Sequence, residues 1–185
     1  MQLHRKFKDE IEIDDSVYQI NASFDVILKI LKLLDDKRIH EVARLGVGLK
    51  LFLGDPLKQY DFEHRVEIFQ KICEMYIEFE KPKLDRLGEP VPSPKGQDND
   101  QVLDYEQDAE YIYASFMQAY GIDLMDQQGK LHWNKFKALL NGLPKGTKVI
   151  EIVSIRSWKP SDDKKKRNTA MRELQETFKL KGKGE

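Results

Sequence analysis

The chain contains a single cysteine, Cys73, which excludes an intramolecular disulfide and any metal site built from several thiolates. Such cysteine usage fits a reducing cytoplasm, because small secreted domains are commonly stapled by several disulfides. The sequence also lacks a run of ~18 apolar residues, and its start, MQLHRKFKDEIEI, mixes charged with apolar side chains. We therefore expect neither a membrane span nor an export signal.

Catalytic and ligand-binding motifs are missing as well. The stretches GVGLK from Gly46 and GLPKGTK from Gly142 match neither GxxxxGK[ST] nor GxGxxG, and we interpret them as helix packing and a turn. The acids from Asp98 to Glu110 suit a helix start better than a pair of catalytic carboxylates. No two histidines are spaced as HxH, HxxxH or HExxH. The histidines are His4, His40, His64 and His132. We expect a non-enzymatic protein with no cofactor and no metal.

The charge balance argues against a protein that binds nucleic acid through bulk electrostatics. The 185 residues carry a formal net charge of -1, whereas such proteins have a basic excess. One basic run interrupts this balance near the C-terminus, and it predicts a solvated helix face or, alternatively, an electrostatic contact with nucleic acid or an acidic protein. The run consists of Lys164, Lys165, Lys166 and Arg167.

Hydrophobic spacing predicts the first half of the chain. Alternating Ile11 and Ile13 before Asp14 predict a small β-hairpin with a polar turn. Apolar residues at steps of three and four then predict helices over 24–34, 37–53 and 61–79. In the first helix the predicted apolar stripe comprises Phe24, Ile27, Leu28, Leu31 and Leu34; Asp61 is the predicted N-cap of the third.

The second half begins after a stretch rich in proline, glycine and polar residues. Residues 82–101 read as a linker between a subdomain at 1–81 and a second at 102–185. In the second subdomain we predict helices over 104–120, 131–140, 147–157 and from 161 onward, although the β-branched run from Val149 to Ile155 also suits a strand. The predicted fold is mainly α, a bundle of about six to seven helices with the N-terminal hairpin and the Pro-rich linker.

The stretch from Asp104 to Leu143 concentrates aromatic residues and helix signals. Asp104 with Gln107 resembles a capping box, and Gly121 is a natural helix end. Seven apolar residues between Tyr105 and Tyr120 form a broad face, which suits a core or a surface for a protein partner. Both alternatives stay open at this point.

Three segments carry a family resemblance: DYEQDAEYIYASFMQAYGIDL from Asp104, LHWNKFKALLNGLP from Leu131 and IVSIRSWKP from Ile152. With the hairpin, the FDVILKILKLLDD helix and the Pro-rich stretch, they resemble the bacteriophage gene-product-fifteen family of tailed phages and prophages of Gram-positive hosts. The resemblance implies a largely helical, non-enzymatic tail-assembly chaperone of the host cytoplasm. Such a protein binds and solubilises the tape-measure protein, and it is expected to be absent from the mature virion.

Under this resemblance the expected partners are the tape-measure protein, other tail proteins and further copies of the chain, without membrane or nucleic acid. A chaperone for a helical client needs apolar surface between helices and a charged exterior. Our hypothesis is that one aromatic core presents its exposed margin to these partners. Its residues are Tyr111, Tyr113, Phe116, Tyr120, Trp133 and Phe136. The alternative is a structural tail or connector component, or a helical adaptor that contacts nucleic acid through its basic C-terminal helix.

Overall fold

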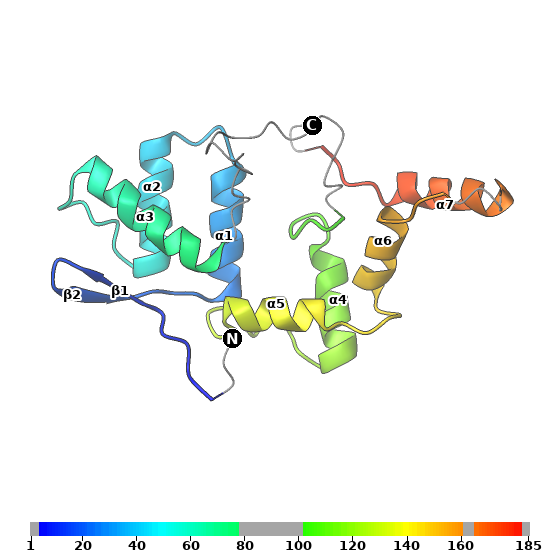
Figure 1. Ribbon diagram of the computed structural model, residues 1–185, viewed down its shortest axis with the longest axis horizontal. Helices are drawn as coiled ribbons and strands as arrows, with labels where there is room; N and C mark the ends of the chain where they lie inside the picture. The colour runs from blue at the N-terminus through cyan, green and yellow to red at the C-terminus, as the bar shows by residue number, and fades with distance from the viewer. Residues whose placement is uncertain (1–3, 78–101, 161–164, 183–185) are drawn as a thin grey trace, which may run out of the picture. The chain divides into compact units, whose positions relative to one another are not determined.

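The computed structural model describes residues 4–77, 102–160 and 165–182, with the backbone alone for 165–168. Within these ranges the chain forms seven helices and one two-stranded sheet, so the predicted mainly α fold is confirmed (Figure 1). The elements are β1 (Glu10–Ile13), β2 (Ser16–Gln19), α1 (Phe24–Asp35), α2 (Glu41–Leu53), α3 (Phe62–Tyr76), α4 (Ala109–Tyr120), α5 (Trp133–Asn141), α6 (Lys148–Arg156) and α7 (Lys165–Thr177). The predicted linker, 82–101, lies outside the described residues.

The N-terminal hairpin is present, as predicted. β1 and β2 pair antiparallel with Ile11 opposite Tyr18 and Ile13 opposite Ser16, which leaves a two-residue turn. Asp14 and Asp15 adopt positive φ angles of 44° and 61°, the left-handed conformation that a tight hairpin turn requires and that Asp tolerates better than most residues. The alternation buries Ile11 and Ile13 and leaves Glu12 in solvent.

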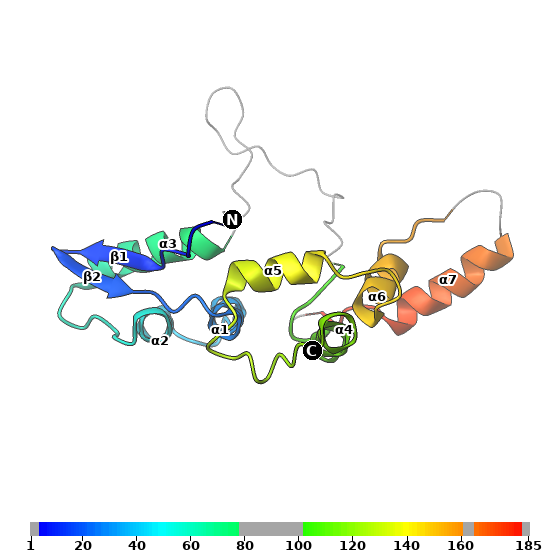
Figure 2. The same ribbon diagram turned by 90° about the horizontal axis from the view of Figure 1, so that it is seen from below.

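The chain divides into two compact units, which Figure 2 shows from a second direction with the element labels. Unit 1 contains residues 1–81 and 125–138, and unit 2 contains residues 82–124 and 139–185. The predicted C-terminal subdomain, 102–185, differs from this division because residues 125–138 pack with the N-terminal elements. The unit boundary falls inside α5.

Unit 1 is built on three helices. α2 contacts both α1 and α3, and the core includes the fully buried side chains of Ile27, Leu49 and Ile72. Asp61 caps α3, as predicted, because its Oδ1 accepts the backbone N–H of His64 at 2.8 Å. This cap explains why α3 starts directly after Asp61.

Residues 125–138 join unit 1 through backbone bonds and rings. The N–H of Phe24 donates to the carbonyl of Leu131 at 2.9 Å, and the N–H of Trp133 donates to that of Ala22 at 2.8 Å. The Phe24 ring stacks on Phe136 with a centroid separation of 5.0 Å. The segment thereby adds a short strand-like pairing and an aromatic layer to the first half of the chain.

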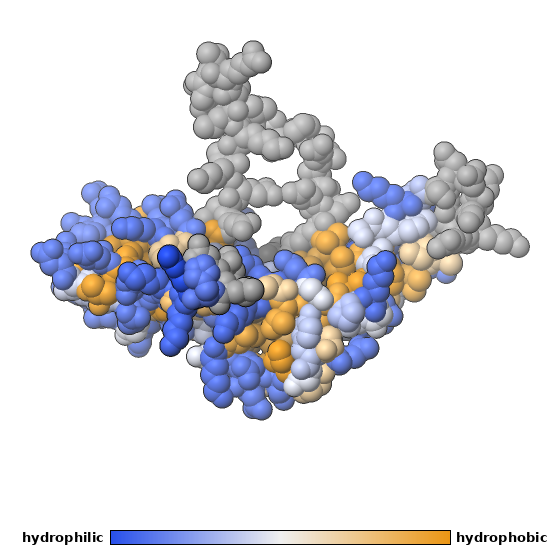
Figure 3. Space-filling model, turned by 60° about the horizontal axis from the view of Figure 1, so that its bottom comes forward, coloured by the Kyte–Doolittle hydropathy of each residue, from blue (hydrophilic) through white to orange (hydrophobic). Residues whose placement is uncertain are grey.

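Unit 2 is formed by α4, α6 and α7, with α6 in contact with both others. The run from Val149 to Ile155 is helical, which resolves the choice between helix and strand. Val149 and Ile152 are buried, whereas Ile150, Val153 and Ile155 are only partly covered. Figure 3 shows hydrophobic side chains at the surface among hydrophilic ones.

Candidate functional site

α4 carries the aromatic residues that the sequence singles out, and its two ends are held by defined bonds. Before the helix, Oδ1 of Asp104 accepts the N–H groups of Glu106 and Gln107, each at 2.9 Å. The predicted capping contact therefore exists, but in the turn that precedes the helix, which begins at Ala109. At the other end Gly121, at φ 64°, donates its N–H to the carbonyls of Met117 and Phe116 and ends the helix, as predicted.

One side of α4 is buried in unit 2. Ile112, Ser115 and Phe116 are its buried residues, and Phe116 is fully inaccessible. The Ser115 hydroxyl donates to the carbonyl of Tyr111 at 2.7 Å and accepts the N–H of Val149 at 3.1 Å. Because that N–H belongs to the first turn of α6, Ser115 joins α4 to a helix start that would otherwise leave a donor unsatisfied.

Tyr113, Met117 and Tyr120 form a partly exposed ridge along α4, which we name the α4 ridge. Their spacing of four and three residues places them on one side of the helix. The Met117 side chain is 40% exposed, while the two tyrosines are half-buried. The α4 ridge thus offers apolar surface beside the buried side of the same helix.

The two tyrosines of the α4 ridge are fixed by their hydroxyl groups. Tyr113 donates to Oδ2 of Asp123 at 3.1 Å, and Tyr120 donates to the carbonyl of Leu139 at 2.9 Å. The Tyr120 ring also lies edge-on to Phe116, with centroids 5.8 Å apart. Rings held in this way lose little conformational entropy when they bind a partner, a property of aromatic residues at interfaces.

The six predicted interaction residues are divided between the two units, and their role in binding a partner stays a prediction. Tyr111, Tyr113, Phe116 and Tyr120 belong to unit 2, whereas Trp133 and Phe136 belong to unit 1. Trp133 and Phe136 are 4% and 1% exposed and serve the core of unit 1, where the two rings stack on each other. Within unit 1, the pairing of 131–133 with 22–24 brings the Phe136 ring against Phe24.

The sequence did not predict a buried ion pair between the start of α4 and the end of α6. Arg156, at the end of α6, donates from Nη1 and Nη2 to the two carboxylate oxygens of Asp108 at 2.6 and 2.8 Å. The two side chains are 10% and 1% exposed. Arg156 also donates to the carbonyls of Val102 and Phe178. The available signal was Arg156 itself, the one cation inside the apolar run IVSIRSW.

Asp108 also closes the turn before α4, because its Oδ2 accepts the N–H of Asp104 at 2.9 Å. The acids near this helix start therefore have separate tasks: Asp104 caps the turn, and Asp108 neutralises a buried guanidinium. Both are fully engaged in structure, which agrees with the interpretation of these acids as helix-start residues. Burial raises the pKa of the neighbouring Tyr105 hydroxyl above its ordinary value.

The basic run lies at the start of α7. Lys164 is outside the described residues, and Lys165, Lys166 and Arg167 form the first turn of the helix. An electrostatic contact through this run stays a prediction.

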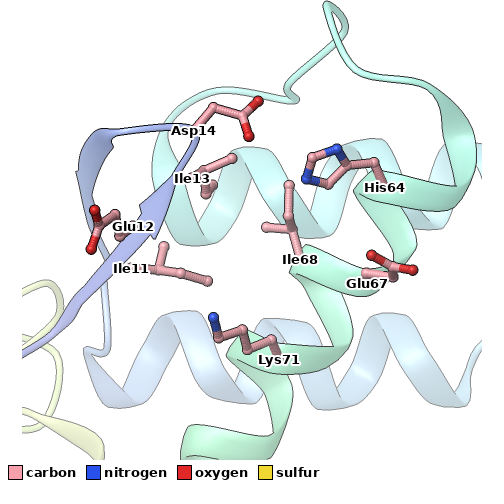
Figure 4. Close-up of a pocket in the computed structure, with 8 residues that line it drawn as sticks. All are labelled: Ile11, Glu12, Ile13, Asp14, His64, Glu67, Ile68 and Lys71. Atoms are coloured by element: carbon pink, nitrogen blue, oxygen red, sulfur yellow. The ribbon is translucent and has the colours of Figure 1, made fainter.

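Unit 1 has a pocket of about 220 Å³ between the hairpin and α3. Figure 4 shows Ile11 and Ile13 of the hairpin opposite Ile68, His64 and Lys71 of α3. The remaining lining residues are Glu12, Asp14 and Glu67. Three isoleucines beside charged side chains of both signs define no ligand class, and the pocket offers no paired acid and base.

A second polar cluster in unit 1 surrounds His132. Oδ1 of Asp9 accepts the Tyr76 hydroxyl at 2.9 Å and lies 3.1 Å from His132 Nε2, and Nδ1 of the same ring accepts the N–H of Asn134 at 3.0 Å. The acceptor role of Nδ1 places the ring proton on Nε2, facing Asp9. Burial, and then Asp9, raises the pKa of Tyr76. Every polar atom named here has a partner, as in a structural cluster.

Over the residues with assigned positions, no three His, Cys, Asp or Glu side chains gather as metal ligands would. In the same ranges, no helix combines the length and the apolar character that crossing a membrane requires.

The fold is that of a small, mainly helical protein with a partly exposed ridge of aromatic residues and methionine on α4. The chain belongs to the family described as Bacteriophage Gp15 protein, whose model matches residues 3–180. It is thus a phage protein, as the resemblance implied. Comparisons with curated proteins and with solved structures gave no significant match.

Proposed function

We propose that this protein is a non-enzymatic tail-assembly chaperone that binds and solubilises the tape-measure protein in the host cytoplasm. Membership of the phage family supports the setting, and the α4 ridge is the observation that carries the proposal. Further copies of the chain and other tail proteins are the additional partners that we expect, without membrane, nucleic acid or cofactor.

The α4 ridge suits an α-helical client. Its residues are spaced by four and three, the spacing with which one helix packs its side chains between those of another. Met117 supplies a flexible, polarisable side chain that adapts to different client residues, and the anchored tyrosines supply rigid area on either side. A long client with a repeating apolar stripe can therefore be covered segment by segment.

Co-expression with the tape-measure protein tests the proposal. We expect the client to be soluble with the wild-type chain, and to become at least partly insoluble with Met117→Glu, which places a charge in the α4 ridge. Met75→Glu is the matched control, because Met75 is also a helical methionine, 44% exposed compared with 40% for Met117, but lies on α3. Equal client solubility with and without the wild-type chain would refute the proposal.

Composition of purified phage particles provides a second test. An assembly chaperone leaves the tail before maturation, so mass spectrometry of virions should find the major tail and tape-measure proteins without this chain. Stoichiometric recovery of the chain from virions would favour a structural tail component instead.

A further inference from the structure

The end of the described chain, residues 178–182, is bound to unit 2 through its backbone. We name this segment the tail; in this subsection the word refers to the end of the chain and not to the tail of the phage. Gln107 donates from Nε2 to the carbonyl of Lys181 at 3.0 Å and accepts the N–H of Lys181 on Oε1 at 2.8 Å. Arg156 donates from Nε to the carbonyl of Phe178 at 2.6 Å. One side-chain amide therefore satisfies both backbone groups of a residue 74 positions away, in the manner of a neighbouring strand.

Two side chains add anchors to these backbone bonds. Phe178 and Leu180 are half-buried, and Nζ of Lys148 lies 5.3 Å from the centroid of the Phe178 ring. Between them Lys179 is exposed, and Phe178 continues the last turn of α7, because its N–H donates to the carbonyl of Leu174 at 3.0 Å. We call Gln107, Lys148 and Arg156 the tail site.

α7 is a polar helix whose Gln175 is bonded to the end of α6. Gln175 donates from Nε2 to the carbonyls of Ile155, Arg156 and Trp158, at 3.0, 3.2 and 2.8 Å, and so covers the end of α6. Leu174 on the same helix is 40% exposed. Directional bonds of Gln107, Arg156 and Gln175 thus help to hold α7 and the tail, and every copy of the chain can supply them.

We propose that the tail site also accepts the tail of a second copy, so that copies associate by tail exchange. The same backbone bonds and the same Phe178 and Leu180 anchors form whichever copy contributes the tail. Because all copies have the same sequence, the tail of a second copy fits the tail site as well as the copy's own. A copy's own tail is covalently connected to it and therefore has a high effective concentration at the tail site. Exchange thus requires a high protein concentration, or a neighbouring copy whose tail site is already occupied by another copy. This inference concerns copies of the chain alone and does not depend on the client.

Complementary full-length variants test the exchange. Gln107→Ala removes the amide from the tail site and leaves the tail intact. A second variant, Phe178→Ala with Lys181→Pro, leaves the tail site intact but removes one anchor and the N–H that Gln107 accepts. In the mixture, the intact tail of the first variant meets the intact tail site of the second.

Sedimentation velocity measures the outcome, with thermal melts to verify that each variant is folded. We expect the mixture to associate at least tenfold more tightly than either variant alone. Lys181→Ala, which keeps the backbone N–H, is the matched control, and its mixture with Gln107→Ala should gain nothing. Where Phe178→Ala lowers the melting temperature, Lys181→Pro alone replaces the double variant. A mixture that sediments as the sum of its components would overturn the proposal.

Discussion

Arg156 and Asp108 form a buried, two-pronged ion pair between residues 48 positions apart, and this pair joins the end of α6 to the start of α4. Bidentate arginine–carboxylate contacts are among the strongest charge-assisted hydrogen bonds. The guanidinium also binds the carbonyls of Val102 and Phe178, so four segments of unit 2 meet at one side chain. Arg156 thus connects the start of α4, the end of α6 and the tail.

Removal of one partner should therefore be costly. We expect Asp108→Ala to lower the free energy of unfolding by about 3–5 kcal/mol, because it leaves a buried guanidinium without its counter-charge. Glu151→Ala is the control, since the Glu151 carboxylate and the Lys148 ammonium are both about half-exposed and 3.8 Å apart. That substitution should cost less than about 1 kcal/mol. Urea unfolding measures both, and similar losses for the two variants would contradict the assigned role.

Gly48 and Gly46 on α2 should respond oppositely to the same substitution. A Cβ built on Gly48 would lie 2.4 Å from the buried Phe69 ring, whereas one on Gly46 would lie 3.4 Å from Nη2 of Arg65. Gly46→Ala should stabilise the protein by up to about 1 kcal/mol through helix propensity. For Gly48→Ala, overpacking should cost about 1–3 kcal/mol and outweigh that gain. Thermal unfolding distinguishes the two, and equal stability of both variants would mean that Phe69 moves aside freely.

The Trp133 side chain caps the C-terminal end of α3, although it lies 57 positions away in the sequence. Its Nε1 donates to the carbonyl of Tyr76, the last residue of that helix, at 2.9 Å. Trp133→Phe should therefore cost about 1–3 kcal/mol for the unsatisfied carbonyl, with a further loss from the vacated volume. Trp158→Phe applies the same change to the other, half-buried tryptophan, and a smaller loss is expected there. An equal cost for both, measured by urea unfolding followed by circular dichroism, would argue against the capping role.

Local patterns were enough to predict most elements of this fold. The hairpin, the Asp61 cap and the Gly121 stop follow from residue chemistry within a few positions, and each is confirmed. The apolar stripe of α1 was predicted less well, because Ile30 and Leu33 are buried while Leu31 and Leu34 are only half-buried. That helix is apolar on most sides, so its spacing alone allows two neighbouring stripes.

Contacts between distant segments account for what the sequence analysis missed. Nothing near Leu131 indicates that its carbonyl will accept a bond from Phe24, and this pairing places Trp133 and Phe136 in unit 1. The partners of Arg156 and of Gln107 are equally remote. Side-chain amides and guanidinium groups bind backbone groups with little regard to sequence, so such contacts leave no periodic signal.

Alkaline pH should destabilise the protein through its buried thiol. Burial raises the pKa of Cys73 from its ordinary value of 9.0 to about 12. The folded state thus holds this proton more tightly than the unfolded chain, so the stabilisation is complete below pH 9.0 and is lost as the pH rises from there toward about 12. A single such group contributes at most about 1.4 kcal/mol per pH unit in that window. The pKa of Tyr76 and of Tyr105 is also raised, which adds to the loss at the upper end.

Urea unfolding at a series of pH values, with reductant present, should show a shallower alkaline decline for Cys73→Ala than for the wild type, whatever the substitution costs at neutral pH. Parallel curves for the two proteins would mean that the thiol is ionised as readily in the folded state as in the unfolded chain.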